Sequence, residues 1–207
     1  MTETDDTVFV VDDDEAIRQS ISFLLRKSGY AVKIFASGDE FLKAVNSASR
    51  GCVLLDVRMP GIDGLEVQAR LAASGIALPV IMLTGHGDVT LAVRAIKAGA
   101  IEFLEKPFER LMLLAAIEEG LCQAKRGVGV LLAKNEAIVR LAALTAREHE
   151  VLKGMVIGRP NKLIAYDLSI ATRTVEVHRA HLMEKLGAPS LSHVLRIAFA
   201  AGIDTPD

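Results

Sequence analysis

The feature that most constrains this chain is an alternation of two hydrophobic periodicities along its first 124 residues. Five short runs rich in β-branched residues are each followed by a segment in which apolar residues recur with helical spacing. These runs are 8–11, 31–35, 52–55, 80–83 and 101–104. Strands that alternate with helices predict an α/β domain with a doubly wound, five-stranded parallel sheet and helices on both faces.

Polar residues stand at the ends of four of these runs. Asp12 and Asp13 follow the first run, Asp56 the third, Thr84 the fourth and Lys106 the fifth. Because the carboxyl ends of parallel strands share one edge, all five side chains are expected to gather there. Three carboxylates need a cation between them, and an all-oxygen set suits Mg²⁺. An aspartate there could accept a phosphoryl group, although helix capping explains the first acidic run better when that run is taken alone.

Composition excludes several classes of protein. With 51% hydrophobic residues the chain can fill a core, which excludes intrinsic disorder. No apolar stretch reaches the roughly 18 residues that a membrane-spanning helix needs, and no secretory leader is visible, so we expect a cytoplasmic protein without a membrane partner. Cys52 and Cys122 lie far apart among apolar residues and are expected to be reduced thiols.

Four sequence stretches together resemble the receiver domain of two-component response regulators. They are VVDDDEAIR, LLDVRMPGIDG, LTGHGD and FLEKPFE, within residues 7 to 122. The resemblance implies that Asp56 accepts a phosphoryl group from a sensor histidine kinase. It also implies that Asp12, Asp13, Asp56 and the main-chain carbonyl of Arg58 hold Mg²⁺. Such a domain is a phosphoacceptor and not an enzyme, with only slow autodephosphorylation and no catalytic residues.

The same resemblance assigns roles to the residues around the phosphoacceptor. Thr84 and Lys106 would contact the phosphoryl group. The Lys106–Pro107 peptide bond would be the one that the family keeps cis. Phe103 would be the aromatic switch, although an ordinary core phenylalanine explains this position equally well. Arg58 and His86 would tune the lifetime of the phosphate, with a plain surface histidine as the alternative for His86.

The charge of the chain changes near residue 127. Residues 1–127 carry 14 Lys and Arg against 18 Asp and Glu, whereas residues 128–207 carry 10 against 8. This difference favours two domains with different partners. We place a linker at 125–143, with a hinge at Gly127 and Gly129, because glycine weakens a helix.

Residues 144–207 show no strand pattern and are predicted to be an all-α domain of four helices. Thr145 and Glu148 form a capping-box pattern, a short helix follows at 161–168, and a longer one begins at Thr172. A short helix, a tight turn and a longer helix are typical of a helix-turn-helix unit. A small helical bundle that binds no DNA is the competing interpretation.

Three further stretches, LTAREHEVLKGMVIG, PNKLIAYDL and TRTVEVHRAHLMEKLGA, resemble the output domain of the LuxR/FixJ class of transcription factors. The resemblance implies that 172–185 is the recognition helix, with His178 left open between a backbone contact and packing. The implied phosphate contacts are Asn161, Lys162, Thr172, Arg173, Thr174 and Lys185, and the implied base-facing residues are Glu176, Val177, Arg179 and Ala180.

Together the two resemblances imply a phosphorylation-activated regulator that binds promoter DNA and works with RNA polymerase, as an activator. Phosphorylation of Asp56 would convert a monomer with a masked output domain into a homodimer, through the helix at 89–98 and the strand from Ile101. The apolar stripe of Leu191, Val194, Leu195 and Ala198 would be core or would pair two output domains. Two alternatives stay open: a phosphohydrolase with Asp56 as its nucleophile, and a helical domain that binds protein, since the recognition helix has few basic residues.

Overall fold

The computed structural model describes residues 7–85, 89–126 and 134–203. By their contacts the described elements form two units, one with the five strands and helices α1, α2, α3 and α5, the other with α4 and α6 to α10. The predictions on His86 and on the hinge at Gly127 and Gly129 fall outside the described residues. The domain boundaries at 124 and 144 stay predictions.

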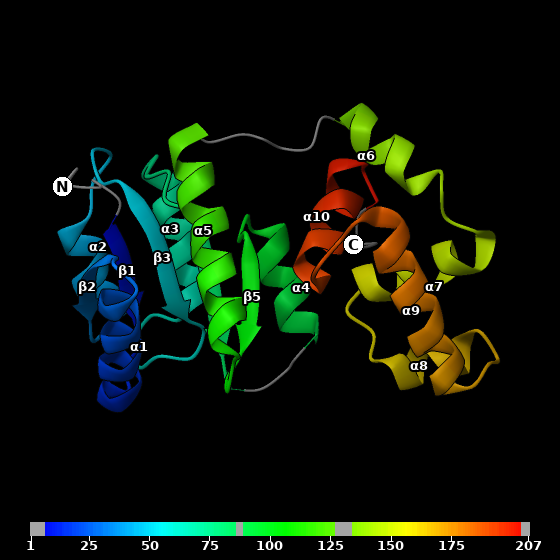
Figure 1. Cartoon of the computed structure of the whole chain (residues 1–207), viewed down its shortest axis with the longest axis horizontal. Coiled ribbons are helices and arrows are strands. Elements are labelled where there is room, and N and C mark those ends of the chain that lie inside the picture. The colour runs from blue at the N-terminus through cyan, green and yellow to red at the C-terminus, as the bar shows by residue number, and fades with distance from the viewer. Residues whose placement is uncertain (1–6, 86–88, 127–133, 204–207) are drawn as a thin grey trace. The chain divides into compact units, whose positions relative to one another are not determined.

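The first unit is built on one parallel sheet, as predicted (Figure 1). Neighbouring strands pair in the order β2-β1-β3-β4-β5, and every pair is parallel. The strands are β1 (Thr7–Val11), β2 (Ala31–Phe35), β3 (Gly51–Asp56), β4 (Val80–Thr84) and β5 (Glu102–Glu105). Their bounds agree with the five hydrophobic runs to within a residue, because each run is long enough for one buried strand.

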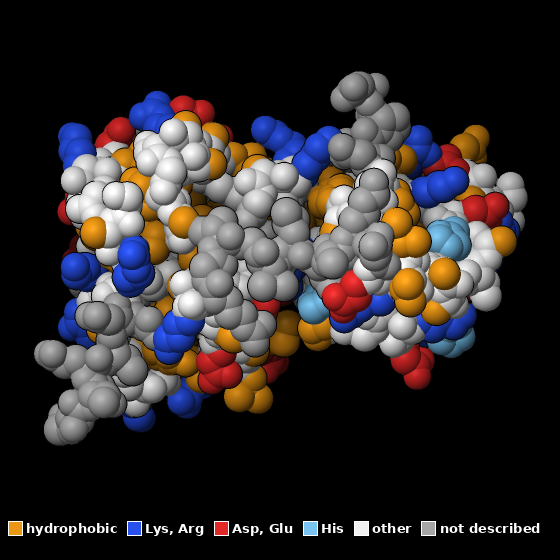
Figure 2. Space-filling model, turned by 90° about the horizontal axis from the view of Figure 1, so that it is seen from above, with side chains coloured by type: hydrophobic (Ala, Val, Ile, Leu, Met, Phe, Trp, Pro, Cys, Tyr) orange, Lys and Arg blue, Asp and Glu red, His pale blue; other side chains and the backbone are white. Residues whose placement is uncertain are grey.

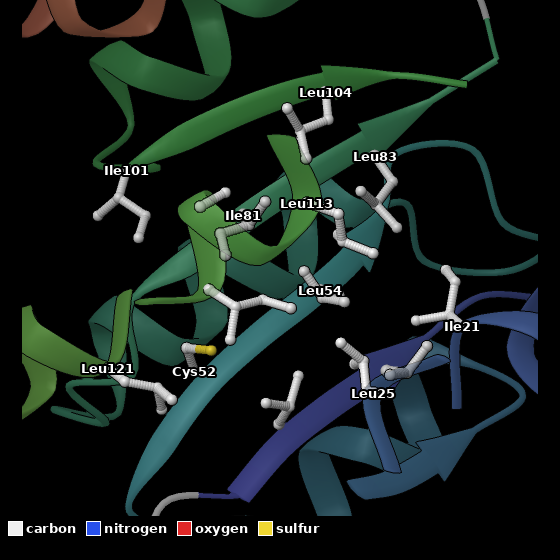
Figure 3. Close-up of a cluster of buried hydrophobic side chains, with 14 residues drawn as sticks. Ile21, Leu25, Cys52, Leu54, Ile81, Leu83, Ile101, Leu104, Leu113 and Leu121 are labelled. Carbon is white, nitrogen blue, oxygen red and sulfur yellow. The ribbon is translucent and has the colours of Figure 1, made fainter. Parts of the chain in front are cut away.

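Alternating residues of each strand fill two cores. Val8 and Val10 of β1 lie under helices α1 (Glu15–Lys27) and α5 (Arg110–Arg126), in the cluster drawn in Figure 3. Phe9, between them, belongs to the opposite face and packs on Phe41 of helix α2 (Gly38–Ala44), with 5.8 Å between the ring centroids. The sheet is therefore covered on both faces, which fixes its strand ends rigidly.

The order of the strands creates one reversal point in the sheet. β1 and β3 are neighbours in the sheet. The helices that follow them, α1 and α3 (Gly64–Ala73), cover separate parts of the sheet. Val11 pairs with Leu55, so the next residues of the two strands, Asp12 and Asp56, come side by side. In open α/β sheets, ligands bind at this type of position, beyond the carboxyl ends of the strands.

The second unit is entirely helical in its described part. It contains α4 (Val89–Lys97), α6 (Lys134–Leu141), α7 (Ala146–Val156), α8 (Asn161–Asp167), α9 (Thr172–Leu186) and α10 (Leu191–Ala200). The predicted capping box is confirmed: the Glu148 amide donates to Thr145 Oγ1 at 3.3 Å, and the Thr145 amide donates to Glu148 Oε2 at 2.7 Å. The short helix α8 followed by the longer α9 confirms the helix-turn-helix plan.

The apolar stripe of α10 is mostly core. Val194, Leu195 and Ala198 are fully buried, whereas Leu191 is half-buried. Within the described residues, no helix is both long and apolar enough to cross a membrane.

Candidate functional site

Lys106 joins the two aspartates that the sheet brings together. Its Nζ atom donates to Asp12 Oδ2 at 2.6 Å and to Asp56 Oδ1 at 2.5 Å. Thr84 lies at the end of the next strand, and its main-chain oxygen accepts from the Lys106 amide at 2.6 Å. Asp12, Asp56 and Thr84 are all at most 5% exposed. We call these four residues the acidic site.

Main-chain groups hold the two carboxylates in place. The Arg58 amide donates to Asp56 Oδ2 at 2.8 Å, and the Asp14 amide donates to Asp12 Oδ1 at 2.9 Å. Asp14 in turn caps α1, since its side chain accepts from two amides of the first turn. Each carboxylate therefore has one oxygen on a main-chain amide and the other on the lysine.

The charges of the acidic site do not balance. Burial raises the pKa of the Asp56 carboxyl above its usual value, and the lysine only partly opposes this effect. Burial lowers the pKa of Lys106, but its hydrogen bonds to Asp12 and Asp56 outweigh this and leave the pKa raised. Two carboxylates around one ammonium leave excess negative charge, and Asp56 and Lys106 both hold a proton more tightly than usual, as their raised pKa values show.

Mg²⁺ fits the chemistry of this site. The donors are carboxylate and carbonyl oxygens, which hard divalent cations prefer, and a divalent cation would neutralise the excess negative charge. In the part of the chain that the structure describes, no three His, Cys, Asp or Glu side chains form a ready metal-binding group. Asp13 and Arg58 are exposed beside the acidic site, and Phe103 is half-buried on β5.

Two residues contact this region that the sequence did not predict to do so. Arg18 of α1 donates from Nη1 to the main-chain oxygen of Asp12 at 2.7 Å. Gly64 begins α3, and a Cβ atom there would lie 2.4 Å from the main-chain oxygen of Asp56. Neither contact has a signal in the local sequence pattern, because both depend on how the start of a helix meets the end of a strand.

The predicted DNA-contacting residues lie on α8 and α9 or directly at their ends. Most are exposed: Lys162, Arg173, Thr174, Glu176, Val177, Ala180 and Lys185. Asn161, Thr172 and Arg179 are half-buried. Figure 2 shows basic and acidic side chains interspersed on the face that it displays, with hydrophobic side chains among them.

Three of these basic side chains have acidic or polar partners within the same chain. Arg179 donates to Asn161 Oδ1 at 2.5 Å, which ties α9 to the first residue of α8. Arg173 lies 3.3 Å from Glu176, at an exposed position.

Lys185 forms the third pair. Its Nζ atom lies 2.7 Å from Glu148 Oε2, which is buried at the start of α7. The structure therefore gives Lys185 a role in packing, whereas its contact with DNA stays a prediction.

Comparison with known proteins finds a family for two parts of the chain. A model of the response regulator receiver domain matches residues 8–118, and a model of bacterial regulatory proteins of the luxR family matches residues 142–198. The chain is 46% identical to the transcriptional regulatory protein FixJ of Bradyrhizobium diazoefficiens, over 95% of this chain and 96% of that protein.

Two further relatives agree. The FixJ protein of Azorhizobium caulinodans is 48% identical, over 97% of this chain and 95% of that protein. A crystal structure of full-length FixJ from B. japonicum is similar with a TM-score of 0.57 and 44% identity, over 96% of this chain and 98% of that one.

Proposed function

The chain belongs to the FixJ-like response regulators, which join a receiver domain to a LuxR-type DNA-binding domain, and from this membership we propose how its residues work. It regulates transcription in a phosphorylation-dependent way, and its family implies a kinase and DNA as partners. The relatives are transcriptional regulators and not typical enzymes, which argues against the phosphohydrolase interpretation. We propose only slow autodephosphorylation.

We propose that Asp56 is the phosphoacceptor, and that the kinase is a sensor histidine kinase. A carboxylate oxygen of Asp56 attacks the phosphorus, an acyl phosphate forms, and the phosphohistidine bond breaks. Asp12, Asp13, Asp56 and the main-chain carbonyl of Arg58 would hold Mg²⁺, which would neutralise the phosphoryl oxygens. Lys106, which donates a hydrogen bond to Asp56 Oδ1, supplies the second positive charge. The burial of the site excludes water.

The response to phosphorylation is proposed to run through Thr84 and Phe103. The new phosphoryl oxygens accept a hydrogen bond from the Thr84 hydroxyl and so draw Thr84 toward the phosphoryl group. The Phe103 ring then turns inward to fill the space that Thr84 leaves. Its half-buried position supports this, since a ring already fully in the core would have nowhere to move. Arg58 and His86, which flank the site in the sequence, would tune the lifetime of the phosphate.

The output is proposed to be binding of promoter DNA by α9. Glu176, Val177, Arg179 and Ala180 would face base edges, with the exposed Val177 suited to a thymine methyl group. The other candidates would contact phosphates: Asn161, Lys162, Thr172, Arg173, Thr174 and Lys185. Phosphorylation would shift a masked monomer to a homodimer that activates transcription with RNA polymerase, in the cytoplasm, where the DNA lies.

The observation that carries the proposal is the ion pair of the buried Asp56 with the half-buried Lys106 at the end of the sheet, in a chain that also holds a helix-turn-helix unit. We would incubate the full chain with genomic DNA fragments, with and without acetyl phosphate and Mg²⁺, and sequence what it retains. Specific fragments are expected only in the phosphorylating condition. The Asp56→Asn variant is expected to retain none and to stay monomeric on size-exclusion chromatography.

Other results would change the proposal in defined ways. Equal recovery in both conditions would mean a DNA-binding protein that phosphorylation does not control. Absence of any specific fragment would support the interpretation in which the helical domain binds protein. Dimerisation of Asp56→Asn in acetyl phosphate, equal to that of the wild type, would rule out Asp56 as the origin of the switch.

A further inference from the structure

The turn between β1 and α1 carries both Asp12 and Asp13, and its geometry is set at four points. The Asp12 amide donates to the Phe35 oxygen at 3.3 Å, and the two carboxylate oxygens of Asp12 accept from Asp14 and Lys106. The fourth point is the main-chain oxygen of Asp12. It lies past the last paired residue of β1, Val11, and it accepts from Arg18 Nη1 at 2.7 Å.

Arg18 acts on this turn from two directions. Its amide donates to the Asp14 oxygen at 3.0 Å, which closes the first turn of α1, while its guanidinium reaches back to Asp12. A hydrogen bond from a charged donor is stronger than a neutral one, and this one is partly buried, so water competes with it poorly. One side chain therefore locks the end of a strand to the start of a helix.

We propose that Arg18 is a positioning residue for the acidic site: its guanidinium fixes the turn that carries Asp12 and Asp13, and so sets the affinity of the site for Mg²⁺. The inference rests on the proposed function, because it assumes that these two carboxylates hold the metal. Asp12 is already held through its side chain. The residue that gains most from a rigid turn is Asp13, which is exposed and whose place depends on the main chain.

The direction of the change in Mg²⁺ affinity on removal of Arg18 distinguishes a positioning role from a purely electrostatic one. A guanidinium beside a cation site repels the cation, so removing a bystander arginine would leave the Mg²⁺ affinity unchanged or increase it. Removing a positioning arginine weakens Mg²⁺ binding, because the turn then samples arrangements in which Asp13 points elsewhere. The two roles therefore predict different changes in Mg²⁺ affinity for the same variant.

The test uses the unphosphorylated full chain and Mg²⁺ alone, measured by isothermal titration calorimetry. Arg18→Gln is expected to raise the Kd for Mg²⁺ about tenfold, as loss of supporting contacts around a metal ligand commonly does. Arg18→Lys, which keeps the charge and a donor, is expected to raise it less. The matched control is Arg26→Gln, which removes the same charge from the same helix, where Arg26 Nη2 donates to the Val32 main-chain oxygen at 3.5 Å.

Phosphorylation by acetyl phosphate at rising Mg²⁺ concentration supplies a second readout. The rate of Arg18→Gln is expected to reach the wild-type value once Mg²⁺ saturates, since Arg18 does not touch the phosphoryl group. An unchanged or lower Kd in Arg18→Gln, or the same rise in Arg26→Gln, would overturn the inference. If the Gln variant fails to fold, the Lys variant decides in the same way. Absence of Mg²⁺ binding in the wild type would instead overturn the proposed function.

Discussion

Lys106 Nζ lies 2.5 Å from Asp56 Oδ1, although 50 residues separate the two in the chain. Asp12 accepts from the same ammonium group, so one cation serves two buried carboxylates. The acidic site is thus held together by the charge of one ammonium group. This arrangement makes its stability sensitive to any change in the number of positive charges.

The first prediction concerns removal of that charge. Lys106→Met leaves two buried carboxylates facing each other, and without Mg²⁺ we expect a loss of about 3 kcal/mol in the free energy of unfolding. Addition of Mg²⁺ should recover more stability in this variant than in the wild type, because the cation takes the place of the ammonium. Thermal unfolding with EDTA and with Mg²⁺ measures both effects.

A double variant serves as its control. Asp56→Asn combined with Lys106→Met removes the repulsion along with the lysine, so its stability should return toward that of the wild type. An equal gain from Mg²⁺ in all three proteins would contradict a charge-based account of the site.

Gly64 provides the second prediction. Alanine at this position would bring its Cβ to 2.4 Å from the Asp56 main-chain oxygen, so either α3 or the end of β3 must move. We expect Gly64→Ala to cost about 2 kcal/mol or more in the free energy of unfolding and to slow phosphorylation by acetyl phosphate. Gly85→Ala is the matched control, since a Cβ there would meet no atom within 4 Å. Equal unfolding temperatures for the two variants would show that α3 tolerates the shift.

The third prediction concerns pH and the DNA-binding domain. The hydrogen bond from Lys185, with that from the Thr145 amide, lowers the pKa of Glu148 from 4.5 to about 2. Because the folded pKa lies below the unfolded one, the ionised Glu148 stabilises the fold above pH 4.5, and this contribution disappears as the pH falls toward 2. Its upper limit is about 3 kcal/mol.

A neutral variant isolates this contribution from the other carboxylates. Glu148→Gln keeps an acceptor for the capping box but loses the ion pair, so it should be less stable than the wild type near pH 7. The difference between the two proteins should shrink as the pH falls below 4.5. Urea unfolding across this range measures it, and a difference that stayed constant with pH would mean that charge has no part in it.

Much of the acidic site could be predicted because parallel strands end at a common edge. Asp12, Asp56, Thr84 and Lys106 each stand at or just beyond the end of a hydrophobic run, so strand periodicity alone brought them together. Arg18 was missed because nothing in the sequence shows that its side chain turns back toward the strand.

The output domain shows the limit of reasoning from residue type. The resemblance to the LuxR/FixJ output domain implies a phosphate contact for Lys185. Its partner Glu148 is 37 residues away and was noted only as a capping residue. The capping-box pattern identified Glu148 and the resemblance identified Lys185, but the contact between them depends on how α7 packs on α9.

The last prediction separates these two roles at lysines of the helix-turn-helix unit. Lys162 is exposed on α8, so Lys162→Met should weaken binding to all DNA sequences alike and reduce the slope of log K against log salt by about 1. Lys185→Met should instead lower the unfolding temperature, because it leaves a buried carboxylate without its ammonium partner, and should leave the salt slope nearly unchanged. Binding titrations of the phosphorylated chain at several salt concentrations, beside thermal unfolding, compare the two variants. A reduced slope with unchanged stability in Lys185→Met would assign that lysine to the DNA backbone.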